Sequence, residues 1–413
     1  MKLAGGYAIG DRFWDRKDDL RLFMDKVAEG NHLLLVAQRR MGKTSLMLEA
    51  ARQLNDQYIC LYVDLQEAFN APDTVARLGV ATYKHKSLRV KVTDLFANAL
   101  ESIRKAVDKV SIGDVGIHLR TGLNDGNWSK KGDELLAILS ECEKPVLLMF
   151  DEIPIMVNRM LKGQDYIITP ERRRDVDEFM SWLRRNSIEH QGKIRMVLSG
   201  SIGFEPVLHQ AGLSATLNTF QPFELLPWNR AVAAGCLQSL SGEYGIKFPD
   251  GAEDEMVDML GCCIPDHVEM FFSHVCDCCC RSERHEFLKR EVAGVYQNEM
   301  LGTRGHAELT HYEERLKMVL GLELFPLALE MLSEAAITGR LSREALEALQ
   351  SDFPFQHGTC AEAETEILRV LEHDGYLRAT SRGYVFVSHL VRDWCKKRYS
   401  LFFTPVLERR RKS

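Results

Sequence analysis

The segment 32–48, which reads HLLLVAQRRMGKTSLML, constrains this chain most. Its apolar run Leu33–Ala37 has the length of a buried parallel strand, and a helical pattern begins at Thr44 after a tight loop. A loop that leads from a strand into a helix turns its backbone N–H groups toward one point, where the helix macrodipole also favours negative charge. The segment therefore predicts a phosphate-binding loop within an α/β fold.

The loop matches the pattern G-x-x-x-x-G-K-[ST] except at its first position, where the chain has Ala37. In this pattern Gly42 leaves room for the phosphate, Lys43 bridges the β- and γ-phosphates, and the Thr44 hydroxyl ligates Mg²⁺. The expected cofactors are therefore ATP and Mg²⁺. The residues predicted to surround the nucleotide phosphates are Gln38, Arg39, Arg40, Met41, Gly42, Lys43, Thr44 and Ser45.

A second apolar run, Pro145–Phe150, is followed directly by Asp151 and Glu152. Ligands of parallel sheets bind at the carboxyl ends of the strands, so these two acids are expected beside the phosphate loop. An apolar strand that ends in two acids is the Walker B arrangement. We expect Asp151 to hold the Mg²⁺ and Glu152 to polarise the attacking water.

The predicted strand Ile194–Leu198 ends in Ser199-Gly200-Ser201. A hydroxyl at this place, on the strand beside Walker B, can contact the γ-phosphate or the lytic water. Ser199 and Ser201 are both candidates, and a plain turn is the alternative. The predicted catalytic residues are Lys43, Glu152, Ser199 and Ser201.

Length and composition describe an ordinary globular protein of two or three domains. The chain has 413 residues, of which 45% are hydrophobic and 27% charged. Its net charge of −6 gives no overall attraction to nucleic acid or to an anionic membrane. No apolar run approaches the roughly 20 residues that span a bilayer, and the N-terminus lacks the apolar core of a signal peptide, so a cytoplasmic protein is expected.

Eleven cysteines in a cytoplasmic chain are expected to be reduced thiols. Several gather near His274, namely Cys262, Cys263, Cys276, Cys278, Cys279 and Cys280. Adjacent cysteines on a helix point in different directions, and the paired C-x-x-C spacing is absent. The pattern favours helix surface or core filling over a zinc or redox site, which stays open as the alternative.

The alternation of strand and helix stops at Pro227, and helical patterns follow. We predict a P-loop ATPase core over residues 1–226, a helical lid over 227–300, and a winged-helix domain with a basic tail over 301–413. The last domain is predicted from three helices, a hairpin and a final helix, over 324–336, 342–350, 363–373, 374–387 and 389–399. Residues 164–174 are predicted to form a loop whose basic run Arg172–Arg174 is solvated. Residues 70–130 show only weak helical spacing, at Leu95, Ala99 and Ile103.

Six motifs follow one another along the chain: FWDR, QRRMGKTSL, LLMFDEIP, VLSGSIG, GCCIP and YVFVSHLVRDW. In this order they resemble the archaeal-type ATPases of the STAND division of P-loop NTPases, relatives of the AAA+ origin-recognition initiators. The resemblance implies a nucleotide-switched ATPase with a helical lid and a winged helix. It also implies a nucleotide contact at Pro265 of the lid motif. The surroundings of His389 are similar to the histidine motif that reads the ADP β-phosphate in STAND proteins of the NLR type, although the Asp that follows that His is missing.

Two departures from AAA+ ring ATPases bear on the rate of hydrolysis. The segment Ile202–Thr219 contains neither Arg nor Lys, and Pro265-Asp266-His267 stands where the lid usually supplies an arginine. An arginine finger is worth roughly 10³ to 10⁵ in rate. Slow turnover that serves as a switch is therefore expected.

Two classes of function are consistent with these features. The first is a regulatory STAND-like or AAA+-like ATPase that acts on a protein partner or through self-assembly. The alternative is a DNA-binding initiator or transposition-type ATPase that uses its winged helix on duplex DNA. The third helix of the predicted winged helix favours a protein partner, because phosphate contacts need Lys and Arg and this helix carries Glu362, Glu364, Glu366, Glu372 and Asp374 against Arg369. The tail Arg409–Lys412 is either solvated or a non-specific grip on nucleic acid.

Overall fold

The structure, a computed structural model, describes residues 7–97, 112–352 and 360–412. The chain forms two compact units. We call Arg16–Val36 with Lys43–Leu225 the sheet unit, and Met1–Asp15, Ala37–Gly42 and Leu226–Ser413 the C-terminal unit. The phosphate loop Ala37–Gly42 thus groups with the C-terminal unit, while the helix that follows it belongs to the sheet unit. The division into three domains stays a prediction.

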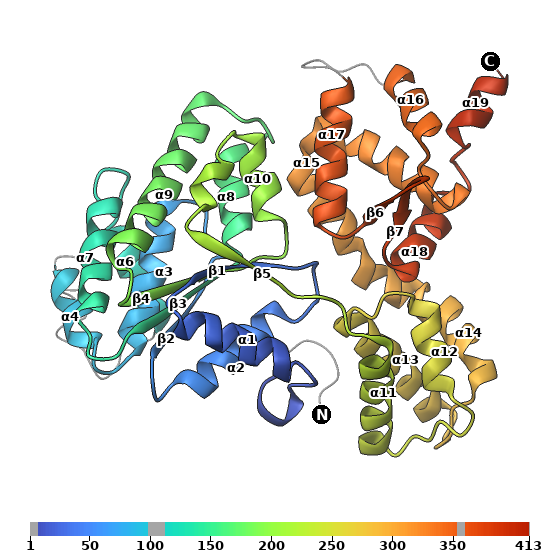
Figure 1. The fold of residues 1–413 in the computed structure, drawn as a ribbon, viewed down its shortest axis with the longest axis horizontal. Coiled ribbons are helices and arrows are strands. Elements are labelled where there is room, and N and C mark those ends of the chain that lie inside the picture. Colours follow the sequence, from blue (N-terminus) through green and yellow to red (C-terminus); the bar gives the residue numbers. More distant parts are fainter. Residues whose placement is uncertain (1–6, 98–111, 353–359, 413) are drawn as a thin grey trace. The chain divides into compact units, whose positions relative to one another are not determined.

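The sheet unit is built on a parallel sheet of five strands in the order β2-β3-β4-β1-β5 (Figure 1). All four pairings are parallel. This arrangement confirms the predicted fold class, a parallel-sheet P-loop core. The strands are β1 His32–Val36, β2 Ile59–Asp64, β3 Val146–Asp151, β4 Ile194–Leu198 and β5 Phe220–Glu224.

Strands β1, β3 and β4 lie within about a residue of their predicted bounds, because each is a short apolar run of the length of a buried strand. Every residue of β3 is buried. The fifth strand was not predicted. Pro222 lies in its middle, and proline is confined to edge strands because it cannot donate to the ladder. The register pairs Leu34 of β1 with Pro222.

Helices cover both faces of the sheet. Helices α1 and α2 lie on one side, and α8, α9 and α10 lie on the other (Figure 1). The bounds are α1 Lys17–Ala28, α2 Lys43–Leu54, α3 Ala71–Lys84, α4 Arg89–Leu95, α6 Ile112–Thr121, α7 Trp128–Ser140, α8 Ile153–Lys162, α9 Pro170–Glu189, α10 Phe204–Gln210 and the 3₁₀ turn η2 Ser214–Leu217.

The predicted loop over residues 164–174 is wrong from Pro170 onward, where α9 begins. The Thr169 side chain accepts a hydrogen bond from the backbone N–H of Arg172 at 3.3 Å, and Pro170 occupies the first helical position. Arg172 is also not simply solvated, because its guanidinium donates to the carbonyl oxygens of Lys162 at 3.0 Å and Ile167 at 2.7 Å. Thr169 and Pro170 are typical of a helix start, but the charged residues that follow them led to the prediction of a loop.

In the described residues of the weakly patterned segment 70–130, the chain forms α3, α4, α6 and the beginning of α7. The side chain of Asn70 caps α3 by accepting from Asp73 N at 3.0 Å. Of the positions predicted to share helical spacing, Leu95 ends α4, whereas Ala99 and Ile103 lie outside the described residues.

The C-terminal unit is mostly helical. Its elements are η1 Gly10–Arg12, α11 Arg230–Tyr244, α12 Ala252–Leu260, α13 Pro265–Arg281, α14 Lys289–Val295, the π-helical turn η3 Tyr296–Met300, α15 Thr303–Thr338, α16 Arg343–Asp352, α17 Cys360–His373, β6 Leu377–Thr380, β7 Gly383–Phe386, α18 His389–Tyr399 and α19 Val406–Lys412. Strands β6 and β7 form an antiparallel hairpin. Helices α15 to α17 followed by this hairpin and α18 fit a winged-helix domain, with the hairpin as the wing.

Helix α15 is interrupted at Gly321, whose φ of 73° and ψ of −171° are not helical. Pro326 follows within the first turns of the second segment, where proline is best tolerated. The predicted helix over 324–336 is this second segment, and the segment from Thr303 onward was not predicted. In the described part of the chain, no helix is long and apolar enough to cross a membrane.

We expect Gly132→Ala to destabilise the sheet unit by about 1–3 kcal/mol, the usual cost of overpacking. A Cβ at Gly132 in α7 would lie 2.6 Å from Cζ2 of Trp182. The indole cannot move easily, because its Nε1 donates to Asp133 at 2.8 Å and its ring contacts Trp128 at a centroid distance of 5.5 Å. Denaturant unfolding of the variant measures the loss.

Gly116→Ala is the matched control, since its Cβ would meet Val80 at an ordinary 3.5 Å. Alanine is favoured over glycine in a helix by up to about 1 kcal/mol, so this variant should be as stable as the wild type or more stable. Equal stability of the two variants would contradict the packing argument.

Candidate functional site

Thr44 and Asp151, the two predicted metal ligands, are in direct contact. The Thr44 hydroxyl donates to Asp151 Oδ2 at 2.6 Å. Asp151 ends β3 and is only 4% exposed, and Thr44 lies in the first turn of α2. The sheet order brings them together, because β1 and β3 are parallel strands separated only by β4 and both end at the same edge.

This pair fits a magnesium ion. Mg²⁺ is held in proteins by one or two carboxylates together with waters and substrate phosphates, and not by an all-protein cage. Among the residues that the structure describes, no group of three His, Cys, Asp or Glu side chains could hold a metal ion. One carboxylate and one hydroxyl are therefore what the chain offers, and they are the oxygen ligands that Mg²⁺ prefers.

Tyr62 is a site residue that the sequence did not reveal. Its hydroxyl, on β2, donates to Asp151 Oδ2 at 2.9 Å, and the backbone N–H of Glu152 donates to Asp151 Oδ1 at 3.0 Å. With Thr44, three donors fix the orientation of this carboxylate. The only available signal was the place of Tyr62 near the end of the strand that neighbours β3, and such a place does not reveal which way a side chain points.

Glu152, the predicted general base, begins the turn into α8 with a φ of 58° and a ψ of 24°. The left-handed conformation costs a residue with a side chain about 1–2 kcal/mol, and such strain is found most often at functional sites. The carboxylate is held in place: its Oε2 accepts hydrogen bonds from Ser201 N and Ser201 Oγ, both at 2.9 Å.

The structure separates the two candidate serines. Ser201 contacts Glu152 through both its backbone and its hydroxyl. Ser199 is fully buried, and its Oγ has no hydrogen-bond partner among the described residues. Its backbone links neighbouring elements instead, because Ser199 N donates to Phe150 O at 2.9 Å and Ser199 O accepts from Ile153 N at 3.2 Å. Of the two candidate serines, Ser201 is the one that contacts Glu152.

The phosphate loop itself has two residues in the left-handed region, Arg40 with φ 66° and Gly42 with φ 87°. A Cβ built on Gly42 would meet nothing within 4 Å, so the positive φ, and not a neighbouring protein atom, requires glycine here. Lys43 begins α2 and is 7% exposed. Of the other predicted phosphate contacts, Met41 is buried, and Gln38, Arg39 and Ser45 are partly exposed.

The loop and the lid motif meet within the C-terminal unit. Pro265 is the first residue of α13, and the N–H of the next residue, Asp266, lies 3.5 Å from the carbonyl oxygen of Arg40. The guanidinium of Arg40 donates to the Asp266 carboxylate and also, at 3.1 Å, to the carbonyl oxygen of Glu308. Neither acid was a predicted site residue. Asp266 follows the proline of the lid motif, which was the one signal available.

His389 lies at the start of α18, where Ser388 caps the helix. Its ring packs against Gly261, since a Cβ on that glycine would be 2.4 Å from His389 Nδ1. It lines a cavity of about 580 Å³ together with Trp228, Arg378 and Cys262. No phosphate-loop residue lines this cavity, so its predicted contact with the ADP β-phosphate stays a prediction.

The cysteine cluster contains free thiols. Burial raises the pKa of Cys276 to about 12 and that of Cys262 to about 11. A metal needs the thiolate form, which burial disfavours. His274 is buried, and its two ring nitrogens have no hydrogen-bond partner among the described residues. Cys262, Cys263, Cys276 and Cys279 are buried in the packing around α13, whereas Cys278 is partly exposed and Cys280 is exposed.

No family model matches this chain, and no curated protein matches it. Solved structures do. A Walker-type ATPase of Pyrococcus abyssi superposes with a TM-score of 0.61 at 15% identity, over 95% of this chain and 98% of that one. The Orc2 protein of Aeropyrum pernix, solved as ADPNP–ADP complexes, superposes with a TM-score of 0.52 at 11% identity, over 96% of this chain and 98% of that one.

At these identities the comparisons show the fold alone. The chain has the fold of archaeal Walker-type and origin-recognition-like P-loop ATPases, which confirms the resemblance seen in the sequence at the level of fold.

A pH-dependent loss of stability is expected from His267. This residue is fully buried on α13, and burial lowers its pKa to about 3, so the folded state keeps it neutral while its Nε2 pairs with the Tyr312 hydroxyl at 3.2 Å. A depressed pKa stabilises the fold above the unfolded value of about 6.5, and the contribution is lost as pH falls below that value. At pH 5 the loss should approach about 2 kcal/mol.

Chemical denaturation at pH 7 and pH 5 measures this loss as the change in unfolding free energy. His267→Gln should show a smaller change between the two pH values than the wild type. His311→Gln, at an exposed histidine, should show the wild-type change. An equal pH dependence in His267→Gln and the wild type would contradict the assignment.

Proposed function

We propose that this chain binds ATP with Mg²⁺ and hydrolyses it slowly, as a nucleotide-dependent switch that regulates or recruits a protein partner. The observation that carries the proposal is the 2.6 Å contact between Thr44 and Asp151. It joins the residue that follows the phosphate-loop lysine to the Walker B acid, and a hydroxyl and a carboxylate at these two places are the protein groups that hold Mg²⁺ in P-loop ATPases.

Each residue of the site has a defined task. Lys43 and the loop N–H groups hold the β- and γ-phosphates, and Thr44 and Asp151 hold Mg²⁺, which neutralises charge on the phosphates when it is bound. Glu152 accepts a proton from the attacking water. Ser201 keeps the Glu152 carboxylate in one orientation through two hydrogen bonds.

Slow turnover is supported by what surrounds the site. The segment Ile202–Thr219 folds into α10 and η2 without an Arg or Lys. On the lid helix, His267 is fully buried and kept neutral, so it supplies no cation to the phosphates. Because neither this segment nor His267 supplies a cation to the phosphates, a switch that holds its nucleotide for long periods fits the site better than a motor does.

A protein partner is favoured over DNA by the surface of α17. Ile367, Leu368 and Leu371 are buried in the core, as predicted, while Glu362 and Glu372 are exposed. An acidic helix would meet the phosphate backbone with repulsion. In the basic tail, Arg409 is already paired with Glu330 at 2.7 Å.

Lys43→Ala should weaken ATP binding roughly tenfold to a hundredfold, because charged hydrogen bonds contribute roughly 1.5–3 kcal/mol.

Glu152→Gln should bind ATP normally and lose on the order of 100-fold or more in turnover, since the amide keeps the shape of the side chain and cannot take a proton. Calorimetry and single-turnover hydrolysis measure the two effects. Lys193→Ala, at an exposed lysine before β4, is the control and should behave as the wild type.

The same measurements separate the two functions. ATP hydrolysis that rises on addition of duplex DNA, with a strong dependence on salt, would favour the DNA-binding alternative. For the switch, the ATP-bound Glu152→Gln protein should retain a protein partner in affinity purification that the Lys43→Ala protein does not. Unchanged ATP affinity in Lys43→Ala would refute the nucleotide site altogether.

The two serines should respond differently to loss of the hydroxyl. Ser201→Ala removes one of two hydrogen bonds to Glu152, and turnover should fall roughly tenfold, in line with one hydrogen bond to a charged group, without a change in ATP affinity. Ser199→Ala removes a hydroxyl that has no hydrogen-bond partner in the described part of the chain and should leave turnover within about twofold of the wild type. Slower hydrolysis in Ser199→Ala than in Ser201→Ala would reverse the assignment.

A further inference from the structure

The backbone of the phosphate loop is already shaped to receive an anion. Arg40 and Gly42 have positive φ values of 66° and 87°, and Met41 between them does not. Alternation of left-handed and right-handed residues turns successive N–H groups to one side and makes a concave nest for an anion. Glycine adopts the left-handed conformation freely. For a residue with a side chain it is disfavoured by roughly tenfold or more.

An arginine in the left-handed conformation destabilises the loop, and the contacts of the Arg40 side chain offset this cost. One guanidinium nitrogen, Nη1, donates to the Asp266 carboxylate and lies 3.8 Å from Oε2 of Glu308. The other, Nη2, donates to the carbonyl oxygen of Glu308 at 3.1 Å. The side chain is only 16% exposed. These contacts tie the strained residue to two helices, α13 through Asp266 and α15 through Glu308.

We propose that Arg40 is a positioning residue for the phosphates: its ion pairs with Asp266 and Glu308 hold the loop in the left-handed conformation that forms the nest. The inference rests on the proposed function, because it concerns the phosphate site of that nucleotide. It goes beyond that function by making the affinity for phosphate depend on α13 and α15. Arg40 contributes through its backbone, while its side chain points to the acids.

The charges around Arg40 agree with this role. Its guanidinium neutralises Asp266 and Glu308, which would otherwise repel a phosphate. Arg39 adds a second positive charge near Asp266, and its Nη1 is buried and has no hydrogen-bond partner among the described residues. Burial lowers the pKa of Arg39, and the nearby charges of Arg315 and Arg40 lower it further. A bound anion relieves this repulsion.

Gln38 provides a second attachment of the loop within the C-terminal unit. Its side chain covers Gly375, in the turn between α17 and β6, so closely that a Cβ there would be 2.0 Å from Gln38 Cδ. The loop is thus held at Gln38 and at Arg40, on either side of Arg39. A displacement of α13 or α15 would release Arg40 and weaken the nest, which couples phosphate binding to these helices.

Paired substitutions at Arg40 test the proposal. Arg40→Ala loses the ion pairs and keeps the cost of the left-handed conformation, so Mg²⁺–ADP should bind roughly tenfold more weakly. Arg40→Gly also loses the ion pairs but adopts the conformation freely, so affinity should return to within about threefold of the wild type. Titration calorimetry on the full chain measures both, and pyrophosphate, which has no base or sugar, should show the same pattern.

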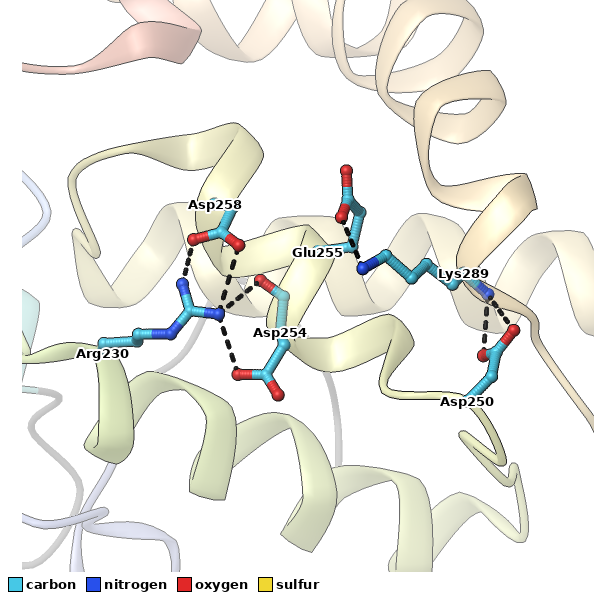
Figure 2. A network of polar contacts seen from close by, with 6 residues as sticks. All are labelled: Arg230, Asp250, Asp254, Glu255, Asp258 and Lys289. Carbon is cyan, nitrogen blue, oxygen red and sulfur yellow. Dashed lines mark hydrogen bonds and ion pairs between the residues drawn. The ribbon is translucent and has the colours of Figure 1, made fainter.

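Arg230→Ala is the matched control. Arg230 also bridges two carboxylates of the C-terminal unit, Asp254 at 3.0 Å and Asp258 at 3.2 Å, and its partners include no phosphate-loop residue (Figure 2). This variant should bind Mg²⁺–ADP as the wild type does. The double variant Asp266→Asn with Glu308→Gln keeps Arg40 and removes the two negative charges that hold its guanidinium, and it should lose affinity as Arg40→Ala does.

Three results would overturn the proposal. They are wild-type affinity in Arg40→Ala, equal weakening in Arg40→Gly and Arg40→Ala, and equal weakening in Arg230→Ala. The second would mean that the guanidinium charge matters and the backbone does not. If the wild type itself binds neither Mg²⁺–ADP nor pyrophosphate, the proposed function fails, and that outcome is distinct from all three. Melting temperatures of the unliganded variants show whether each one is folded.

Discussion

The hydrogen bond between Thr44 and Asp151 depends on the whole parallel sheet. These residues are 107 positions apart, and their side-chain oxygens are 2.6 Å apart. The contact follows from the sheet order, because β4 alone separates β1 from β3 and all three strands run in the same direction. The buried apolar strands form the core that holds this arrangement together. The chemistry at the carboxyl edge is thus a consequence of how the core packs.

Two of the residues to which we give functional tasks have a strained backbone conformation. Only a few residues other than glycine have a positive φ in the described part of the chain, and Arg40 and Glu152 are two of them. Each is held by specific partners: Arg40 by the acids on α13 and α15, and Glu152 by Ser201. Strained backbone persists only where surrounding contacts fix it. The contacts that do so here are long-range and polar, which makes these two positions sensitive to changes elsewhere in their units.

Local sequence patterns predicted the parts of the site that lie within one strand and its loop. Lys43, Thr44, Asp151 and Glu152 each follow an apolar run, and the parallel fold places such positions at one edge. Tyr62 could not be predicted in the same way, because its role depends on which strand neighbours β3.

The acids that hold Arg40 are also distant in sequence. Asp266 and Glu308 lie more than 200 residues beyond the loop, with intervals of 226 and 268 positions. Nothing local distinguishes them from other surface acids. The same limit explains α9, where a strong cap at Thr169 was masked by charged residues, and β5, where Pro222 broke the apolar pattern. In both cases the secondary structure of the segment depends on its tertiary packing and cannot be predicted from its composition alone.

Pro222 has a further consequence for how copies of this chain can associate. Strand β5 is the last in the sheet order, so its outer edge is the natural place for another strand to add. Proline has no N–H group, and it is accepted in a strand where the missing donor faces outward. An incoming strand would find a gap in the ladder at this position. Extension of the sheet by a strand of a second copy is thereby disfavoured at β5.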